Sequence, residues 1–117
     1  MSRPVVAVPL LTLLTVALWA PSIANGFVFD DLTNILRNEW IKDWRLLGQA
    51  FTHHAAGFDP SYSTSLYRPM MHVLYAAVYA MSGAKPWAYH LLNVAFHLLC
   101  TIAAFWMLRA ALARLPA

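Results

Sequence analysis

The sequence predicts an all-α membrane protein with two spanning helices joined by a long extracytoplasmic loop. Apolar residues make up 61% of its 117 residues and charged residues only 11%, less than half of the roughly 25% typical of soluble proteins. Two uncharged apolar runs, 4–24 and 87–108, each reach the ~20 residues that a helix needs to cross a bilayer. The charges lie between and outside these runs, as expected for aqueous segments.

The distribution of charge predicts which side of the membrane each segment occupies. All five acidic residues lie between positions 30 and 59, and five basic residues within 21–88 balance them. The net charge of +3 therefore comes from Arg3, Arg109 and Arg114. Short basic flanks stay in the cytoplasm, so we expect both termini there and the loop 25–86 outside. The Ala-rich helices favour a bacterial inner membrane, with a periplasmic loop.

The same composition excludes several classes of protein. A disordered chain needs low hydrophobicity and high net charge. A nucleic-acid-binding module needs clustered basic residues, whereas the eight Lys and Arg residues here are scattered. The single cysteine, Cys100, excludes an internal disulfide and a multi-cysteine metal site.

The first apolar run, 4–24, has two interpretations. It is long enough to span, but a positive residue, an apolar stretch and the small residues Ser22 and Ala24 also resemble a cleavable secretory signal. Cleavage after Ala24 would leave one spanning helix and the same loop outside.

Two shorter helices are expected inside the loop, near 37–51 and 69–82. In the first, Trp40, Trp44, Leu47 and Phe51 recur at helical spacing and would form one apolar face. That face would lie in the membrane interface or pack on neighbouring protein.

The second loop helix is expected to begin at Pro69 and end at Gly83. Its apolar core is too short for a comfortable span, so we expect an interfacial helix. The alternative, three spanning helices, would place Arg109 and Arg114 outside. One face of this helix carries polar-tipped side chains, namely Arg68, His72, Tyr75 and Tyr79.

The second spanning run, 87–108, carries His90, Asn93 and His97 on one face. Polar side chains in a membrane helix usually face other protein, so this face predicts neighbouring helices. An alternative function follows, in which the chain is a small non-enzymatic membrane subunit that docks on a larger partner through this face.

Three groups of polar residues in the loop are candidate sites. Asp30 and Asp31 follow the first spanning helix, where a carboxylate can act as a general base and Asp31 can cap the next helix. Arg68 lies at a helix N-terminus and suits an anionic oxygen, from either a lipid headgroup or a specific phosphate. His53, His54 and Asp59 form a less favoured metal site, because adjacent histidines point apart.

Four short motifs occur in an order that resembles a known family: FVFDD (27–31), LTNIL (32–36), YRPM (67–70) and HLLNV (90–94). From about 16 to 108 the sequence resembles the N-terminal portion of a GT-C fold membrane glycosyltransferase. Within that fold it is most similar to the protein O-mannosyltransferase-like family that carries tetratricopeptide repeats.

The resemblance implies transfer of a mannose-like sugar from a polyprenyl-phosphate carrier to an extracytoplasmic hydroxyl on a protein or glycan acceptor. It implies Asp30 as the catalytic base and Asp31 as its helper. Arg68, Tyr67 and, less directly, His90 become candidate substrate-binding residues. No metal is implied, and no cofactor beyond the lipid-linked donor. Family members have many more spanning helices, so we expect this chain to be an N-terminal fragment that is inactive without the remaining helices.

Overall fold

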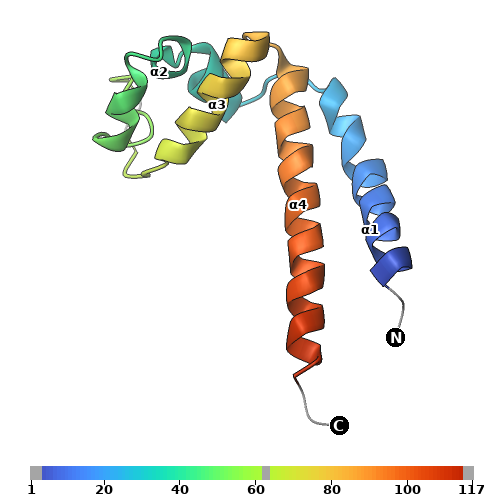
Figure 1. The fold of residues 1–117 in the computed structure, drawn as a ribbon. Helices are drawn as coiled ribbons and strands as arrows, with labels where there is room; N and C mark the ends of the chain where they lie inside the picture. The colour runs from blue at the N-terminus through green and yellow to red at the C-terminus, as the bar shows by residue number, and fades with distance from the viewer. Residues whose placement is uncertain (1–3, 62–63, 115–117) are drawn as a thin grey trace. The chain divides into compact units, whose positions relative to one another are not determined.

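The computed structural model describes residues 4–61 and 64–114, and across these ranges it is helical with no strand (Figure 1). The helices are α1 (Pro4–Trp19), η1 (Ala20–Ala24), η2 (Leu32–Leu36), α2 (Glu39–Lys42), η3 (Leu47–Phe51), α3 (Pro69–Ser82) and α4 (Pro86–Leu112). The chain divides into two compact units. We call residues 1–25 with 90–117 the helix-pair unit, and residues 26–89 the central unit.

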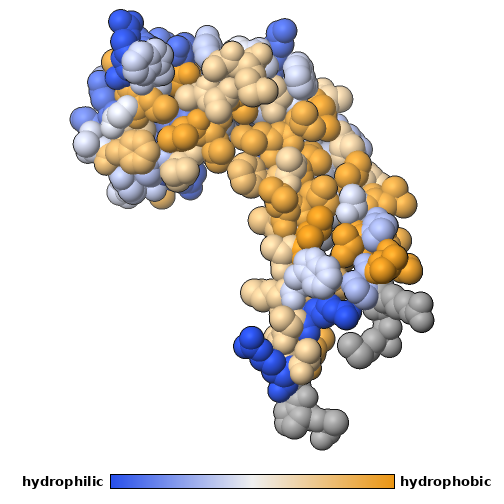
Figure 2. Space-filling model, in the orientation of Figure 1, coloured by the Kyte–Doolittle hydropathy of each residue, from blue (hydrophilic) through white to orange (hydrophobic). Residues whose placement is uncertain are grey.

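The helix-pair unit contains the two predicted spanning segments. Pro4–Ala24 and Pro86–Leu112 are each long and apolar enough to cross a membrane, and only 6% of each apolar window is buried within the protein. The core helix of a soluble protein would be mostly buried. Within this unit α1 and α4 run in opposite directions (Figure 1), and apolar side chains cover much of their surface (Figure 2). The prediction of two such helices is confirmed, while Arg3 lies outside the described residues.

Helix α3 has the predicted bounds, because two local signals set its ends. Pro69 occupies the first turn, and Gly83 ends the helix with φ 64° and ψ −151°, a conformation that is essentially restricted to glycine. The helix has 14 residues, which is about 21 Å at ~1.5 Å per residue. Since a bilayer core is roughly 30 Å thick, α3 alone is too short to span. The part of the chain that the structure describes thus holds two candidate spans rather than three.

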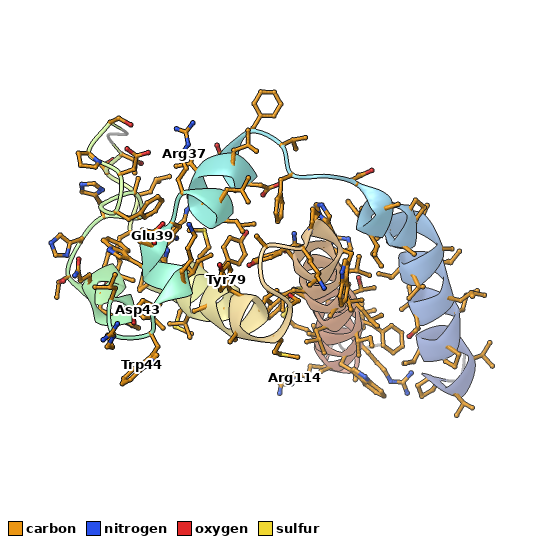
Figure 3. The ribbon with its side chains drawn as sticks, turned by 90° about the horizontal axis from the view of Figure 1, so that it is seen from above. Arg37, Glu39, Asp43, Trp44, Tyr79 and Arg114 are labelled. Atoms are coloured by element: carbon orange, nitrogen blue, oxygen red, sulfur yellow. The ribbon has the colours of Figure 1, made fainter. Side chains whose placement is uncertain are left out.

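The prediction of one helix near 37–51 is wrong. The segment forms α2 and η3, separated by a turn in which the Asp43 carboxylate accepts bonds from the Arg45 backbone N–H and guanidinium, at 2.8–3.2 Å. These bonds to Arg45 lower the pKa of Asp43. The break separates the expected face, so that Trp40 is 4% exposed and Trp44 is 82% exposed. Figure 3 shows Trp44 projecting away from the ribbon.

The core of the central unit is small and partly aromatic. Ile35, Ile41 and Tyr89 are buried together, and Phe27 and Tyr75 pack against them with edge-on ring contacts to Tyr89 at 5.5 and 5.4 Å. Helix α3 packs mainly against α2. The polar-tipped face of α3 therefore turns toward protein: His72 is fully buried, and Tyr75 and Tyr79 are partly buried.

Candidate functional site

A strained turn precedes η2 and presents the two adjacent aspartates. Phe29 has φ 44°, in the left-handed region that bulky residues rarely adopt. Two bonds between Val28 and Asp31 close the turn: the Asp31 N–H donates to the Val28 carbonyl at 3.0 Å, and the Val28 N–H donates to Asp31 Oδ2 at 3.2 Å. Asp31 thus occupies the predicted N-cap position of η2, but its side chain makes no cap bond to that helix and reaches back to the turn.

A small pocket in the central unit brings Asp30 and Arg68 together. Its volume is about 30 Å³, which is room for about one water-sized group. Three stretches of chain supply the wall: Asp30 and Asn34; Ala55 and Ala56; and Thr64, Leu66, Arg68 and Met71. The Ala55 N–H donates to the Leu66 carbonyl at 2.7 Å and ties the second stretch to the third.

The pKa of Tyr75 on α3 is affected by the charges of Asp30, Asp31 and Arg68. Its pKa is raised, first by burial of the phenol and then by the charge of Asp31, with a further contribution from Asp30 and an opposing one from Arg68. All three charges therefore act on one phenol of α3. Tyr75 follows Arg68 by seven residues on the same helical face, so the periodicity pointed to it, although we did not predict it as a site residue.

Neither Asp30 nor Arg68 is neutralised by a direct ion pair. Among the described residues, the ion pairs are Lys42–Glu39 at 2.7 Å and Arg45–Asp43 at 2.8 Å. A carboxylate and a guanidinium that line one pocket without pairing remain available, the first to accept a proton and the second to bind an anionic oxygen.

Two predicted substrate-binding residues lie elsewhere. Tyr67 is 59% exposed, and its hydroxyl donates to the Phe51 carbonyl at 3.0 Å, so it ties η3 to the stretch before α3. His90 lines a second pocket, of about 320 Å³, within the helix-pair unit. That pocket is lined by Trp19, Ser22, Asn25, His90, Asn93, Val94 and His97.

The polar face predicted on the second spanning helix meets the first helix in this pocket. The rings of Trp19 and His97 pack edge-on with centroids 4.4 Å apart. An edge-on ring contact thus joins the two helices at this level.

The residues of the metal hypothesis are engaged separately. His53 Nδ1 lies 3.1 Å from the Gln49 carbonyl and 2.9 Å from the Thr52 hydroxyl. Asp59 accepts bonds from Ser61, which lower its pKa. Within 4–61 and 64–114, no three His, Cys, Asp or Glu side chains are grouped to hold a metal ion.

Comparisons with known proteins place the sequence. No protein-family model matches it, and no solved structure matches it. The protein O-mannosyl-transferase TMTC3 of Mus musculus is 33% identical over 97 residues, which are 81% of this chain and 10% of that protein. The protein of the same name from Homo sapiens is 35% identical over 83 residues, 69% of this chain and 9% of that protein.

The chain therefore spans about a tenth of the length of the curated relatives it matches. The matches confirm the resemblance seen in the motifs at the level of the family. Over most of its length, this chain belongs with the O-mannosyltransferase-like proteins.

Proposed function

We propose that this chain is the N-terminal part of a GT-C type membrane glycosyltransferase that moves a mannose-like sugar from a polyprenyl-phosphate carrier to an extracytoplasmic hydroxyl. The observation that carries the proposal is the meeting of Asp30 and Arg68 in one pocket. Two relatives named as protein O-mannosyl-transferases support the transferase class. The two apolar helices support a membrane location.

The pocket offers the two charges that such a transfer needs. Asp30 takes the proton of the acceptor hydroxyl as its oxygen attacks the anomeric carbon. A new carbon–oxygen bond forms there, while the bond from the same carbon to the carrier phosphate breaks and its electron pair leaves with the phosphate. Arg68 binds that phosphate and stabilises its growing negative charge. The configuration of the anomeric carbon is inverted.

The size of the pocket fits the acceptor side of this reaction. A volume of about 30 Å³ suits the reacting hydroxyl of the acceptor beside Asp30. The rest of the donor site is then supplied by further helices of the longer protein, and this chain alone transfers no sugar. Asp31 acts as the helper that holds the turn. Tyr67 and His90 remain proposed substrate-binding residues, each outside this pocket.

The proposed topology follows from the charged ends. Both termini lie in the cytoplasm, and the segment between the two spanning helices lies on the outer side of the membrane, which for a bacterial inner membrane is the periplasm. The carrier lipid and a protein or glycan acceptor are the expected partners, and tetratricopeptide repeats are expected later in the chain.

The test is transfer of radiolabelled mannose from polyprenyl-phosphate mannose to a Ser/Thr-rich peptide or a glycan by the full native protein in liposomes. Asp30→Asn should lower turnover by about 10²- to 10⁴-fold, the usual contribution of a general base. Asp43→Asn is the matched control, because Asp43 is paired with Arg45 outside the pocket, and it should leave turnover unchanged. Wild-type turnover in Asp30→Asn would sink the assignment of the base.

A second candidate function rests on the other pocket. The His90, Asn93 and His97 face lines a pocket in the helix-pair unit, where a partner helix with a polar side chain could hydrogen-bond to these residues. In this reading the chain is a non-enzymatic subunit. Asn93→Leu should then dissociate a complex isolated from native membranes without affecting insertion, and a complex of unchanged composition would refute the reading.

A further inference from the structure

His72 is a buried polar residue that the proposed chemistry does not use. Its side chain is 0% exposed, and it lies on α3 one turn after Arg68. The rings of Trp40 and Phe58 pack edge-on against it, with centroids 5.4 and 6.0 Å away. Burial lowers the pKa of His72, so its imidazole is neutral and has one donor and one acceptor nitrogen.

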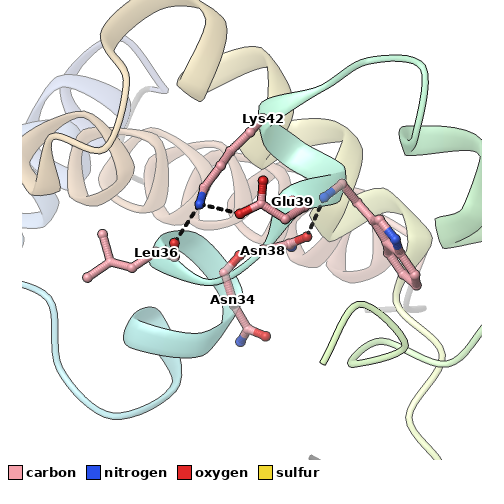
Figure 4. A network of polar contacts seen from close by, with 6 residues as sticks. Asn34, Leu36, Asn38, Glu39 and Lys42 are labelled. Carbon is pink, nitrogen blue, oxygen red and sulfur yellow. Dashed lines mark hydrogen bonds and ion pairs between the residues drawn. The ribbon is translucent and has the colours of Figure 1, made fainter. Parts of the chain in front are cut away.

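The hydrogen bonds of Asn38 decide which nitrogen is which. Asn38 is also 0% exposed, and its Oδ1 accepts the Trp40 backbone N–H at 3.0 Å (Figure 4). Its Nδ2 is therefore the donor, to the Asn34 carbonyl at 3.0 Å and to His72 Nδ1 at 2.9 Å. His72 Nδ1 accepts, so Nε2 carries the hydrogen.

This network joins the wall of the small pocket to the helix that carries Arg68. Asn34 lines the pocket with Asp30, and its carbonyl, in the π-helical turn η2, accepts a hydrogen bond from the Asn38 side chain at 3.0 Å. The same Asn38 amide group holds His72 on α3. One side-chain amide thus bridges the two segments that contribute Asp30 and Arg68.

The other side of the ring faces the second stretch of the wall. The Ala55 backbone favours the protonated form of His72 and raises its pKa against the effect of burial, although Nε2 makes no hydrogen bond of good geometry. Ala55 itself lines the pocket. His72 is therefore linked to all three stretches of the pocket wall: to the first through Asn38, to the second through Ala55, and to the third along α3. It does not itself line the pocket.

We propose that His72 is a positioning residue which, through Asn38, fixes Asp30 opposite Arg68. This inference rests on the proposed transferase function. A phenyl ring would fill the same space among Trp40 and Phe58 but would leave Asn38 Nδ2 without its His72 partner. The segment bearing Asp30 would then be free to shift. A misplacement of about 1 Å at a reacting group costs on the order of 100-fold in rate.

The experiment measures kcat and the KM for polyprenyl-phosphate mannose in the full native protein, at a temperature well below the unfolding of each variant. His72→Phe should lower kcat by about 10- to 100-fold and leave KM within about threefold, since donor binding is not the step it serves. His72→Asn should recover most of the loss, because its Oδ1 can accept from Asn38. The packing control is Phe58→Leu, which loosens the same ring cluster and should keep wild-type kcat.

A double-variant cycle separates positioning from stability. If His72 acts through Asn38, the losses of kcat in Asn38→Ala and His72→Phe should not add in the double variant. Additive losses, or a Phe58→Leu variant that loses kcat in proportion to its melting temperature, would overturn the positioning role. Wild-type kcat in His72→Phe would also overturn the positioning role. If Asp30→Asn were inactive at the same time, the proposed transferase function would still stand. A wild-type protein that transfers no mannose would remove both.

Discussion

Gly57 allows a sharp test of the packing behind the site. A Cβ at this position would lie 2.8 Å from Trp40 Cη2, 3.0 Å from His53 Cβ and 3.2 Å from the His54 carbonyl oxygen. Carbon atoms closer than 3.0 Å must move apart. Two of these three neighbours, His53 Cβ and the His54 carbonyl oxygen, are fixed by the backbone and cannot move without it. The third, the Trp40 ring, is packed edge-on against Phe58 and His72. Gly57→Ala therefore overpacks the cluster.

Overpacking a tight core costs about 1–3 kcal/mol, and each kcal/mol lowers the melting temperature of a 60–100-residue domain by roughly 4–8 °C. We expect Gly57→Ala to melt at least about 4 °C below the wild type. Gly48→Ala is the matched control: it has no atom within 4 Å of the added Cβ and lies within η3. Alanine there should hold or raise stability, by up to about 1 kcal/mol.

The assay is thermal unfolding in detergent micelles, followed by tryptophan fluorescence, because Trp40, one of five tryptophans, lies in the cluster. Equal melting temperatures for the two variants would refute the reasoning, since the argument depends on the neighbours of each Cβ and on nothing else.

Four further outcomes follow from the same structure. Gly83→Ala should destabilise α3 by roughly 1–3 kcal/mol, measured as free energy of unfolding. Phe29→Gly should be at least as stable as wild type, because glycine has no Cβ to strain in the left-handed region. Phe29→Val should be less stable than wild type, because a β-branched residue fits that region worse, and a reversed order would contradict the strain at φ 44°. The pKa of His72 is lowered from 6.5 in the folded protein, so the unfolded chain binds more protons and stability should fall as the pH drops below about 6.5. His72→Gln should therefore flatten a plot of melting temperature against pH. An unchanged slope would count against this prediction. Tyr67→Phe should increase protease cleavage near η3, because its bond to the Phe51 carbonyl is lost, and should raise the KM of the full protein. An unchanged KM would count against the proposed substrate contact.

The elements that the sequence predicts well are those set by local rules. Pro69 and Gly83 define α3 by their own backbone preferences, and the two uncharged runs define the long helices by length and composition. Each of these features depends on a few neighbouring residues, so no knowledge of the rest of the fold is required.

The features that the sequence did not reveal depend on contacts between distant segments. The break between α2 and η3 follows from the Asp43–Arg45 turn, which competes with the helical spacing of the tryptophans. The burial of His72 depends on Asn38 and Phe58, and the meeting of Asp30 with Arg68 depends on how α3 packs. The periodicity of α3 identified the correct face but not what that face packs against.

The strained turn at Phe29 has a consequence for evolution by substitution. Its two bonds require a carboxylate or amide oxygen at position 31 and a backbone N–H at position 28. Asp30 lies between Phe29 and Asp31, so the closed turn sets the direction of its side chain. Proline at position 28 or an aliphatic residue at position 31 would let the turn open, and the orientation of position 30 would be lost even with its carboxylate intact. The two adjacent aspartates are thus not interchangeable: Asp31 keeps the turn closed through its bond to Val28, and the closed turn sets the direction of the Asp30 side chain.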